Sequence, residues 1–384
     1  MVFGNARVIF GDGISEDVEV RVEGGVVAEV GQGMASRDVI DLHGAYLAPG
    51  FVDLHVHGAM GRDTMEAKAD ALRALCDFHL RGGTTALLPT TVTAPLEEIC
   101  AVVTTAEEAS AELPQIIGVH IEGPFIAREK AGAQNSRFIC APTGAAVSRL
   151  LELAKRSGAR GRVRRITLAP ELPGAVEAVA RFVNAGFTVS GGHSNAWEEE
   201  AKACFERGMH SVTHTFNCMS SARQRGKERV AGLLEFALSE SQVRCELIAD
   251  GYHVSTTLMR MLYAAKGAKG IILVTDATAG AGSKEGTPFQ LGGRECVVEN
   301  GACWLADRSA LAGSAASMIE LVRTMVNRVD VPLAEAVAMA SRNPACAIGL
   351  HEKGEIARGR DADLLVLSPE LEVQQVYLRG ERAL

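Results

Sequence analysis

The sequence predicts an α/β protein in which a (β/α)8 barrel is joined to a small β-sandwich domain built from both termini. Two observations predict the barrel: apolar strand-like segments alternate with amphipathic helical segments, and eight such strands can be identified. A third observation predicts the small domain, because both ends of the chain consist of short alternating strands separated by glycine turns. We expect residues 51–345 to form the barrel, and residues 1–50 and 346–384 to form the sandwich.

The two ends of the chain have the same texture. In the first fifty residues Val18, Val20 and Val22 alternate with polar residues, which is typical of a half-exposed strand. The tail, KGEIARGRDADLLVLSP followed by LEVQQVYLRGE, shows similar short runs and no helical stripe. We therefore expect the two ends to build one β unit together.

The middle of the chain supplies the eight barrel strands. Helical stretches such as ADALRALCDFHLRGG lie between several of them, and this alternation implies a parallel sheet. A doubly wound sheet is the competing fold, but no G-x-G-x-x-G motif follows an early strand. The expected strands are 51–57, 84–90, 116–122, 165–171, 187–193, 211–217, 245–251 and 271–277.

Composition excludes several classes of partner. The 384 residues carry a net charge of −8, so we expect no basic face for nucleic acid. No apolar stretch approaches the roughly 18 residues of a membrane span, and MVFGNARVIFGDG lacks the apolar centre of a signal peptide. Nine cysteines without C-x-x-C pairs indicate reduced thiols, and we expect a cytoplasmic protein.

Polar residues gather at the carboxyl ends of the expected strands, which open on one face of a barrel, where active sites form. Side chains two apart on a strand share a side, so two histidines of the first strand are expected to point into the mouth. Imidazole and carboxylate ligands suit Zn²⁺ or Fe²⁺. Satisfied polar groups at strand ends are the alternative, which fits a single residue better than the whole set. The set is His55, His57, Glu122, His193, His214, Asn217, Asp250, His253 and Asp276.

Four other histidines are not expected to be ligands. His43 lies in a turn before the barrel, and His351 belongs to the tail. His79 lies near the end of a helix that precedes two glycines. His210 precedes its strand and should lie at the wrong end of the barrel.

Several motifs carry a resemblance to a known family. PGFVDLHVHG and KGEIARGRDADLLVL resemble the two ends of amidohydrolase superfamily proteins. Six further motifs, in order along nearly the whole chain, resemble the family of N-acetylglucosamine-6-phosphate deacetylases. This resemblance implies a barrel of the amidohydrolase type that removes an acetyl group from an amino sugar phosphate in amino sugar catabolism. The six motifs are HIEGPF (120–125), GGHS (191–194), VTHTFN (212–217), ADGYHV (249–254), VTDAT (274–278) and LAGS (311–314).

The resemblance also implies roles for individual residues. Glu122, His193 and His214 match the main metal ligands, and His55 with His57 matches a pair that holds a second metal in some members, so one or two Zn or Fe ions per subunit are expected. Asp276 matches the catalytic acid/base. The positions that match the holders of the sugar phosphate are Ala133, Gln134, Asn217, Cys218, His253 and the 311–313 backbone of Leu311, Ala312 and Gly313.

The chain departs from the family pattern around the substrate. Cys218 replaces the usual alanine after Asn217, and RQRGKERVAG replaces the usual Arg-Glu-Pro-Gly phosphate loop. Arg225 is the best match for the phosphate arginine, with Arg223 and Arg229 as alternatives; the planar guanidinium pairs two phosphate oxygens at once. The resemblance implies a homodimer in which this arginine reaches across from the neighbouring subunit.

Three alternatives to glucosamine phosphate deacetylation stay open. One is the galactosamine 6-phosphate epimer, whose recognition depends on loop contacts. Another is an amidohydrolase of different specificity, although the fourth strand ends in Ala169-Pro170-Glu171 and lacks the lysine typical of cyclic-amide members. The last is a non-catalytic barrel scaffold, which the presence of every expected ligand and of Asp276 disfavours.

Overall fold

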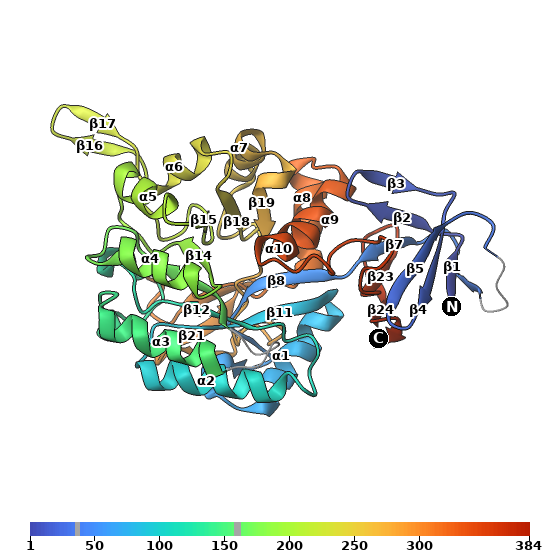
Figure 1. The fold of residues 1–384 in the computed structure, drawn as a ribbon, viewed down its shortest axis with the longest axis horizontal. Coiled ribbons are helices and arrows are strands. Elements are labelled where there is room, and N and C mark those ends of the chain that lie inside the picture. The colour runs from blue at the N-terminus through green and yellow to red at the C-terminus, as the bar shows by residue number, and fades with distance from the viewer. Residues whose placement is uncertain (35–38, 157–162) are drawn as a thin grey trace.

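In the computed structural model, which describes residues 1–34, 39–156 and 163–384, a single eight-stranded parallel sheet forms the centre of the larger domain (Figure 1). Its strand order is β19-β18-β15-β14-β13-β12-β11-β8. All eight predicted strands are present, so the predicted fold class is confirmed. The strands are β8 (Phe51–Val56), β11 (Thr84–Thr91), β12 (Val119–Glu122), β13 (Val163–Leu168), β14 (Thr188–Gly191), β15 (Met209–Val212), β18 (Arg244–Leu247) and β19 (Ile271–Leu273).

The sheet nearly closes on itself beside its first and last strands. The backbone N–H of Asp276 donates to the carbonyl of His55 at 2.9 Å, and Val56 and Ala277 form a parallel bridge. This contact brings the first barrel strand next to the segment that follows the last one. Most predicted strands ran several residues too far at their carboxyl ends, because the chain there turns into loops.

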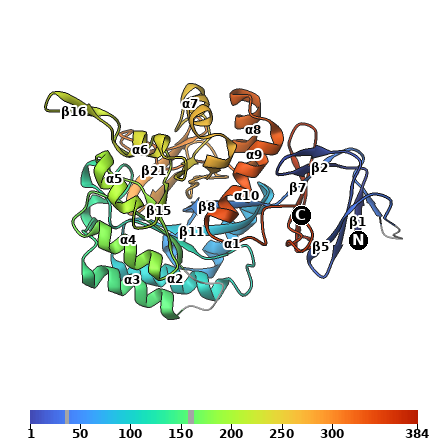
Figure 2. The same ribbon diagram turned by 45° about the horizontal axis from the view of Figure 1, so that its top comes forward.

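Helices surround the sheet, as the ribbon shows in two orientations (Figures 1 and 2). They bury one apolar face each; in α8, for example, Leu321, Val322 and Met325 are buried, and a capping box of Ser317 and Glu320 starts the helix. The helices are α1 (Ala69–Arg81), α2 (Leu96–Ala109), α3 (Gly144–Arg156), α4 (Ala175–Asn184), α5 (Glu198–Phe205), α6 (Leu233–Ser239), α7 (Thr256–Lys266), α8 (Met318–Val329), α9 (Leu333–Ala340) and α10 (Arg342–Ala347). Short 3-10 turns are η1 (Thr64–Glu66), η2 (Arg128–Lys130), η3 (Ser136–Phe138) and η4 (Ala268–Gly270).

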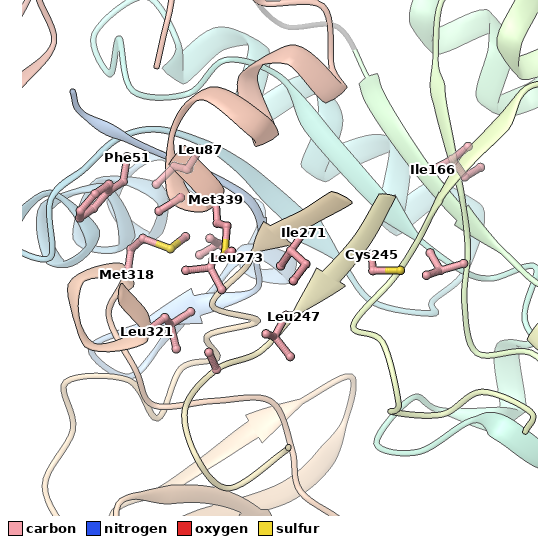
Figure 3. Close-up of a cluster of buried hydrophobic side chains, with 14 of the residues drawn as sticks. Phe51, Leu87, Ile166, Cys245, Leu247, Ile271, Leu273, Met318, Leu321 and Met339 are labelled. Atoms are coloured by element: carbon pink, nitrogen blue, oxygen red, sulfur yellow. The ribbon is translucent and has the colours of Figure 1, made fainter. Parts of the chain in front are cut away.

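The main core lies between the sheet and its helices. Phe51, Leu87 and Leu273 of the strands pack in one cluster with Met318 and Leu321 of α8 (Figure 3). Such side chains contribute roughly 1.5–3 kcal/mol each when fully buried. The barrel is therefore held by apolar packing on its outside, which leaves its mouth free for polar groups.

A second cluster closes the opposite end of the barrel. Leu54 and Ile272 of the strands pack inside against Ile348 and Leu350, which follow α10. His210 lies at this closed end, with Nε2 3.3 Å from the carbonyl oxygen of Ala347. Its predicted exclusion from the mouth agrees with this position.

Both termini build a small β-sandwich, as predicted. β23 pairs with β7, so the C-terminal and N-terminal segments share a sheet, and Phe3, Leu47 and Leu364 lie in the apolar cluster of this domain. The division at residue 346 remains a prediction, because Ile348 and Leu350 pack against the barrel. One sheet has the order β5-β4-β1-β6 and the other β25-β24-β23-β7-β2-β3, with β1 (Val2–Gly4), β2 (Arg7–Phe10), β3 (Gly13–Ser15), β4 (Glu19–Glu23), β5 (Val26–Gly31), β6 (Val39–Asp41), β7 (Tyr46–Pro49), β23 (Leu364–Leu367), β24 (Val373–Leu378) and β25 (Glu381–Arg382).

Three antiparallel units were not predicted. The largest is a three-stranded sheet of β20 (Pro288–Leu291), β21 (Arg294–Glu299) and β22 (Ala302–Leu305), inserted between β19 and α8. Gly292 and Gly293, with φ of 56° and 77°, join β20 to β21, and such a glycine pair between alternating residues is a hairpin signal. The others are hairpins of β9 (Gly58–Ala59) with β10 (Arg62–Asp63), and β16 (Arg223–Arg225) with β17 (Glu228–Val230).

No helix in the described ranges combines the length and apolar character that crossing a bilayer requires.

Candidate active site

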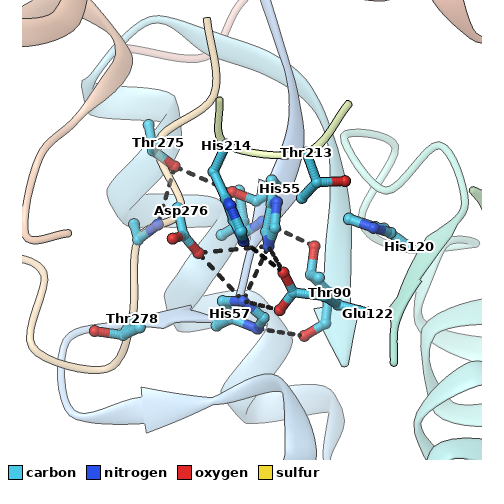
Figure 4. Close-up of polar contacts among 12 residues, drawn as sticks. His55, His57, Thr90, His120, Glu122, Thr213, His214, Thr275, Asp276 and Thr278 are labelled. Atoms are coloured by element: carbon cyan, nitrogen blue, oxygen red, sulfur yellow. Dashed lines mark hydrogen bonds and ion pairs between the residues drawn. The ribbon is translucent and has the colours of Figure 1, made fainter. Parts of the chain in front are cut away.

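The predicted ligand side chains converge at the carboxyl-end mouth of the barrel (Figure 4). Glu122 is the last residue of β12, whereas His193, His214 and Asp276 lie just beyond their strands. These last three have φ of 46°, 32° and 49°, a left-handed conformation that is uncommon for residues with side chains. Such strain persists where surrounding structure enforces it, and it occurs frequently at functional sites.

Glu122 joins two groups of side chains that have the geometry of a metal site. Its Oε1 lies 3.2 Å from His193 Nε2 and 3.1 Å from His214 Nε2. Its Oε2 lies 3.3 Å from His57 Nε2, and Oε1 lies 3.4 Å from His55 Nε2. Within each group, one ligand atom per residue lies within 4.8 Å of the others. The structure thus brings together all five residues that the sequence predicted as ligands.

Neighbouring carbonyl groups orient two of the imidazole rings. His193 Nδ1 lies 2.7 Å from the carbonyl of Lys130, and His57 Nδ1 lies 3.1 Å from that of Thr90. A carbonyl oxygen accepts a hydrogen bond from Nδ1–H, so the proton stays on Nδ1 and the Nε2 lone pair faces Glu122. These contacts pre-set the tautomer that a metal ligand needs.

The electrostatics of the cluster favour protons on its histidines when no cation is present. Burial opposes the charged form of His57, but Asp276 and Glu122 outweigh it and raise the pKa of His57 to about 9. Burial likewise opposes ionisation of Asp276, yet His55 and His57 lower the pKa of Asp276 to about 2. A bound cation would compete with these protons for the same nitrogen atoms.

The donor set fits a divalent metal ion. Both groups combine imidazole nitrogens with a carboxylate, and all their members are buried. Buried unpaired charge is costly, whereas a cation surrounded by such donors balances it. Imidazole and carboxylate ligands are those that zinc and other borderline metals select.

Asp276 lies between the ligand cluster and a cavity. Its Oδ1 lies 3.2 Å from His57 Nε2 and 3.4 Å from His55 Nε2. The cavity has a volume of about 200 Å³ and also borders Glu122. A larger cavity of about 700 Å³ lies beside the small domain, but none of these ligand side chains lines it.

Most of the predicted substrate residues line this cavity: Ala133, Gln134, Asn217, Cys218, His253, Leu311 and Gly313. Val92, Gly132, Leu291 and Ala310 line it too and were not predicted. Leu291 comes from the unpredicted three-stranded sheet, and only the tertiary fold brings it here.

Two predicted substrate residues have other contacts. Gln134 Nε2 donates to Glu122 Oε2 at 2.5 Å and its Oε1 accepts from the Thr93 N–H at 2.6 Å, so it supports the ligand carboxylate. Ala312 is fully buried, and its N–H donates to the carbonyl of Cys303 while its own carbonyl accepts from the Thr278 hydroxyl. Its backbone is therefore occupied within the fold.

Arg225 lies away from the cavity of its own chain. It is on the β16–β17 hairpin, which projects from the body of the molecule (Figure 1). There its guanidinium pairs with Glu199 and lies over the Trp197 ring, 4.7 Å from the ring centroid. The alternatives Arg223 and Arg229 share this hairpin and do not line the cavity either. Within one chain, Arg225 is therefore not placed to bind a phosphate in this cavity.

Sequence reasoning missed two charged residues beneath the ligand cluster. Arg165 on β13 and Glu246 on β18 are fully buried and form an ion pair of 2.6 Å. The available signal was a charged residue within an apolar strand, as in RRITL and CELIA. Such residues are rarely buried unless they are paired.

Comparisons with known proteins identify the family of the chain. A model of the Amidohydrolase family matches residues 46–383. The chain is 32% identical to N-acetylglucosamine-6-phosphate deacetylase of Lysinibacillus sphaericus, over 99% of this chain and 97% of that protein. It is 31% identical to N-acetylgalactosamine-6-phosphate deacetylase of Escherichia coli O157:H7, over 98% and 97%.

Solved structures show the same similarity. The N-acetylglucosamine-6-phosphate deacetylase of Pasteurella multocida superposes with a TM-score of 0.92 at 31% identity, covering 99% of this chain and 98% of that one. A point mutant of the Mycobacterium smegmatis enzyme, in complex with N-acetyl-D-glucosamine-6-phosphate, also gives 0.92 at 31% identity, covering 100% and 98%.

Proposed function

The chain belongs to the amidohydrolase family, and we propose that it hydrolyses N-acetyl-D-glucosamine 6-phosphate to D-glucosamine 6-phosphate and acetate. The observation that carries this proposal is the convergence of Glu122, His193 and His214 beside a cavity that Asp276 borders. The printed activities of relatives that this chain matches over 97% and 87% of their own lengths support the substrate.

The proposal includes one or two divalent ions per chain, zinc or iron. Glu122, His193 and His214 would hold one, and His55 and His57 would hold a second that shares Glu122. When bound, such an ion polarises an amide carbonyl and lowers the pKa of water, which an unactivated amide requires for hydrolysis at neutral pH.

Asp276 is proposed as the group that moves the proton. Its side chain is ionised at neutral pH, as an ordinary aspartate is, and the carboxylate takes a proton from the attacking water as oxygen bonds to the acetyl carbon. The same carboxyl then gives the proton to the nitrogen as the C–N bond breaks, so the amine leaves neutral. His253 lines the cavity where the sugar phosphate would bind. Its Nδ1 lies 2.7 Å from Asp250 Oδ2, which holds the ring in place.

We also propose that the protein is a cytoplasmic homodimer in which Arg225 of one chain binds the phosphate held by the other. The projecting hairpin supports this arrangement, because Arg225 does not reach the cavity of its own chain. Nine free cysteines support a reducing compartment.

A second candidate substrate is N-acetylgalactosamine 6-phosphate, because relatives with that printed activity are about as similar to this chain. Acetate release from the gluco phosphate, the galacto phosphate and non-phosphorylated N-acetylglucosamine tests both candidates. We expect the gluco phosphate to be the best substrate. Faster turnover of the galacto phosphate would favour the second candidate. Equal rates with the non-phosphorylated sugar would contradict the proposed phosphate contact.

A further inference from the structure

A buried ion pair lies directly beneath the ligand cluster, inside the barrel. Arg165 of β13 and Glu246 of β18 are both fully buried, and Arg165 Nη2 lies 2.6 Å from Glu246 Oε1. Burying two charges is costly, and replacement by apolar residues is often neutral or stabilising. The surroundings of the pair indicate a role other than stabilising the fold.

The second oxygen of Glu246 faces the ligands. Oε2 lies 3.7 Å from His55 Nδ1 and accepts from the His214 backbone N–H at 3.3 Å. His55 Nδ1 has no hydrogen-bond partner within the described residues. The carboxylate that faces this nitrogen is that of Glu246. In His57 and His193, a backbone carbonyl oxygen lies in the corresponding position beside Nδ1.

We propose that Glu246 is a positioning residue for the metal centre and that Arg165 fixes Glu246 in place. The carboxylate favours the Nδ1–H tautomer of His55, which turns the Nε2 lone pair toward Glu122. Through the His214 N–H the same carboxylate ties β8 to the loop after β15, so the two ligand groups keep a fixed separation. This inference rests on the proposed metal-dependent function.

Zinc binding by Glu246→Gln and by the charge-balanced double variant Arg165→Met/Glu246→Gln tests the proposal. The double variant leaves no unpaired buried charge, so it keeps the test valid where the single variant folds poorly. Zinc content and chelator-competition affinity are measured on purified protein. Loss of an outer carboxylate typically weakens metal binding by roughly 10–100-fold. We expect that loss in both variants, mainly at the site that includes His55.

Lys353→Met/Asp361→Asn/Asp363→Asn is the matched control, because it removes another largely buried ion-pair cluster near the small domain, in which Lys353 lies 2.8 Å from Asp361 and 2.7 Å from Asp363, and leaves no partner charged. We expect this control to keep wild-type zinc affinity even where its melting temperature falls. Wild-type zinc content and affinity in both Glu246 variants would overturn the inference while leaving the proposed function intact. The inference would also be overturned if the His55→Gln variant kept the zinc content of the wild type. A wild-type protein that binds no zinc or iron would instead remove the proposed function, and this inference with it.

Discussion

At the scale of single residues, the site depends on side chains whose backbone leaves the strand conformation. His193, His214 and Asp276 have positive φ angles and lie just beyond their strands. Their side chains converge with those of Glu122 and His57 at the mouth of the barrel. Neighbours then fix the rings, as the Lys130 carbonyl does for His193.

Asp276→Asn should retain bound metal and lose turnover by several orders of magnitude. The amide keeps the shape of the carboxylate but cannot take a proton from water. Acetate release and metal content, measured on the same preparation, check this. Near-normal turnover would refute the role of Asp276, and loss of metal would show that it acts mainly as a ligand.

His79 should make the stability of the metal-free protein depend on pH. Burial lowers the pKa of His79 to about 4, below the usual 6.5, so the unfolded state binds the proton more readily. Above pH 6.5 His79 is neutral in both states and does not reduce the free energy of unfolding. As the pH falls from 6.5 toward 4, His79 is protonated in the unfolded state first, which lowers the free energy of unfolding by about 2 kcal/mol at pH 5. Urea unfolding in the presence of chelator should show a steeper fall from pH 7 to 5 in the wild type than in His79→Leu. Equal slopes would contradict this assignment.

At the scale of elements, the link between the small domain and the barrel is closely packed against a neighbouring strand. β7 of the small domain continues into β8 through Gly50, where an added Cβ would lie 2.1 Å from Thr85 Oγ1 of β11. A glycine at this position therefore leaves room for the Thr85 side chain beside the link between β7 and β8. The β16–β17 hairpin, by contrast, projects outward and places its arginines away from the mouth.

Arg225→Ala should raise KM for the phosphorylated substrate by roughly 10–100-fold, with a smaller effect on kcat, because the variant loses a charged hydrogen bond to the phosphate. Steady-state kinetics measure this. Glu199→Gln is the matched control, because it removes the partner of Arg225 and keeps the guanidinium. An equal rise of KM in the control would show that only the Arg225–Glu199 pair matters.

At the scale of the whole molecule, near-closure of the barrel assembles the site. β8 meets the segment after β19, which places Asp276 beside His55 although Asp276 follows the last strand of the barrel and His55 lies in the first. The predicted ligands come from β8, β12 and the segments after β8, β14 and β15, and they form two groups that share Glu122. Ions bound to these groups would link segments that are far apart in the chain.

Metal removal should therefore lower the melting temperature by several degrees. A ligand that binds only the folded state stabilises it by about 4 kcal/mol at a thousandfold excess over its Kd. Calorimetry with and without chelator checks this, and added Zn²⁺ should restore the transition. His193→Gln should show a much smaller metal-dependent shift. An unchanged wild-type transition would argue against a tightly bound ion.

The sequence by itself determined the eight strands and the β-sandwich texture of both termini, and it predicted which histidines and carboxylates converge at the mouth, because these depend on local periodicity and on motifs at strand ends. The tertiary structure decided which of those residues share a cavity. It pairs the Ala312 N–H with the Cys303 carbonyl, gives Gln134 a contact with Glu122 and leaves Arg225 off the lining of the cavity of its own chain. It also brought Leu291 and the Arg165–Glu246 pair to the site, because contacts between residues far apart in the chain depend on barrel closure, which no local pattern encodes.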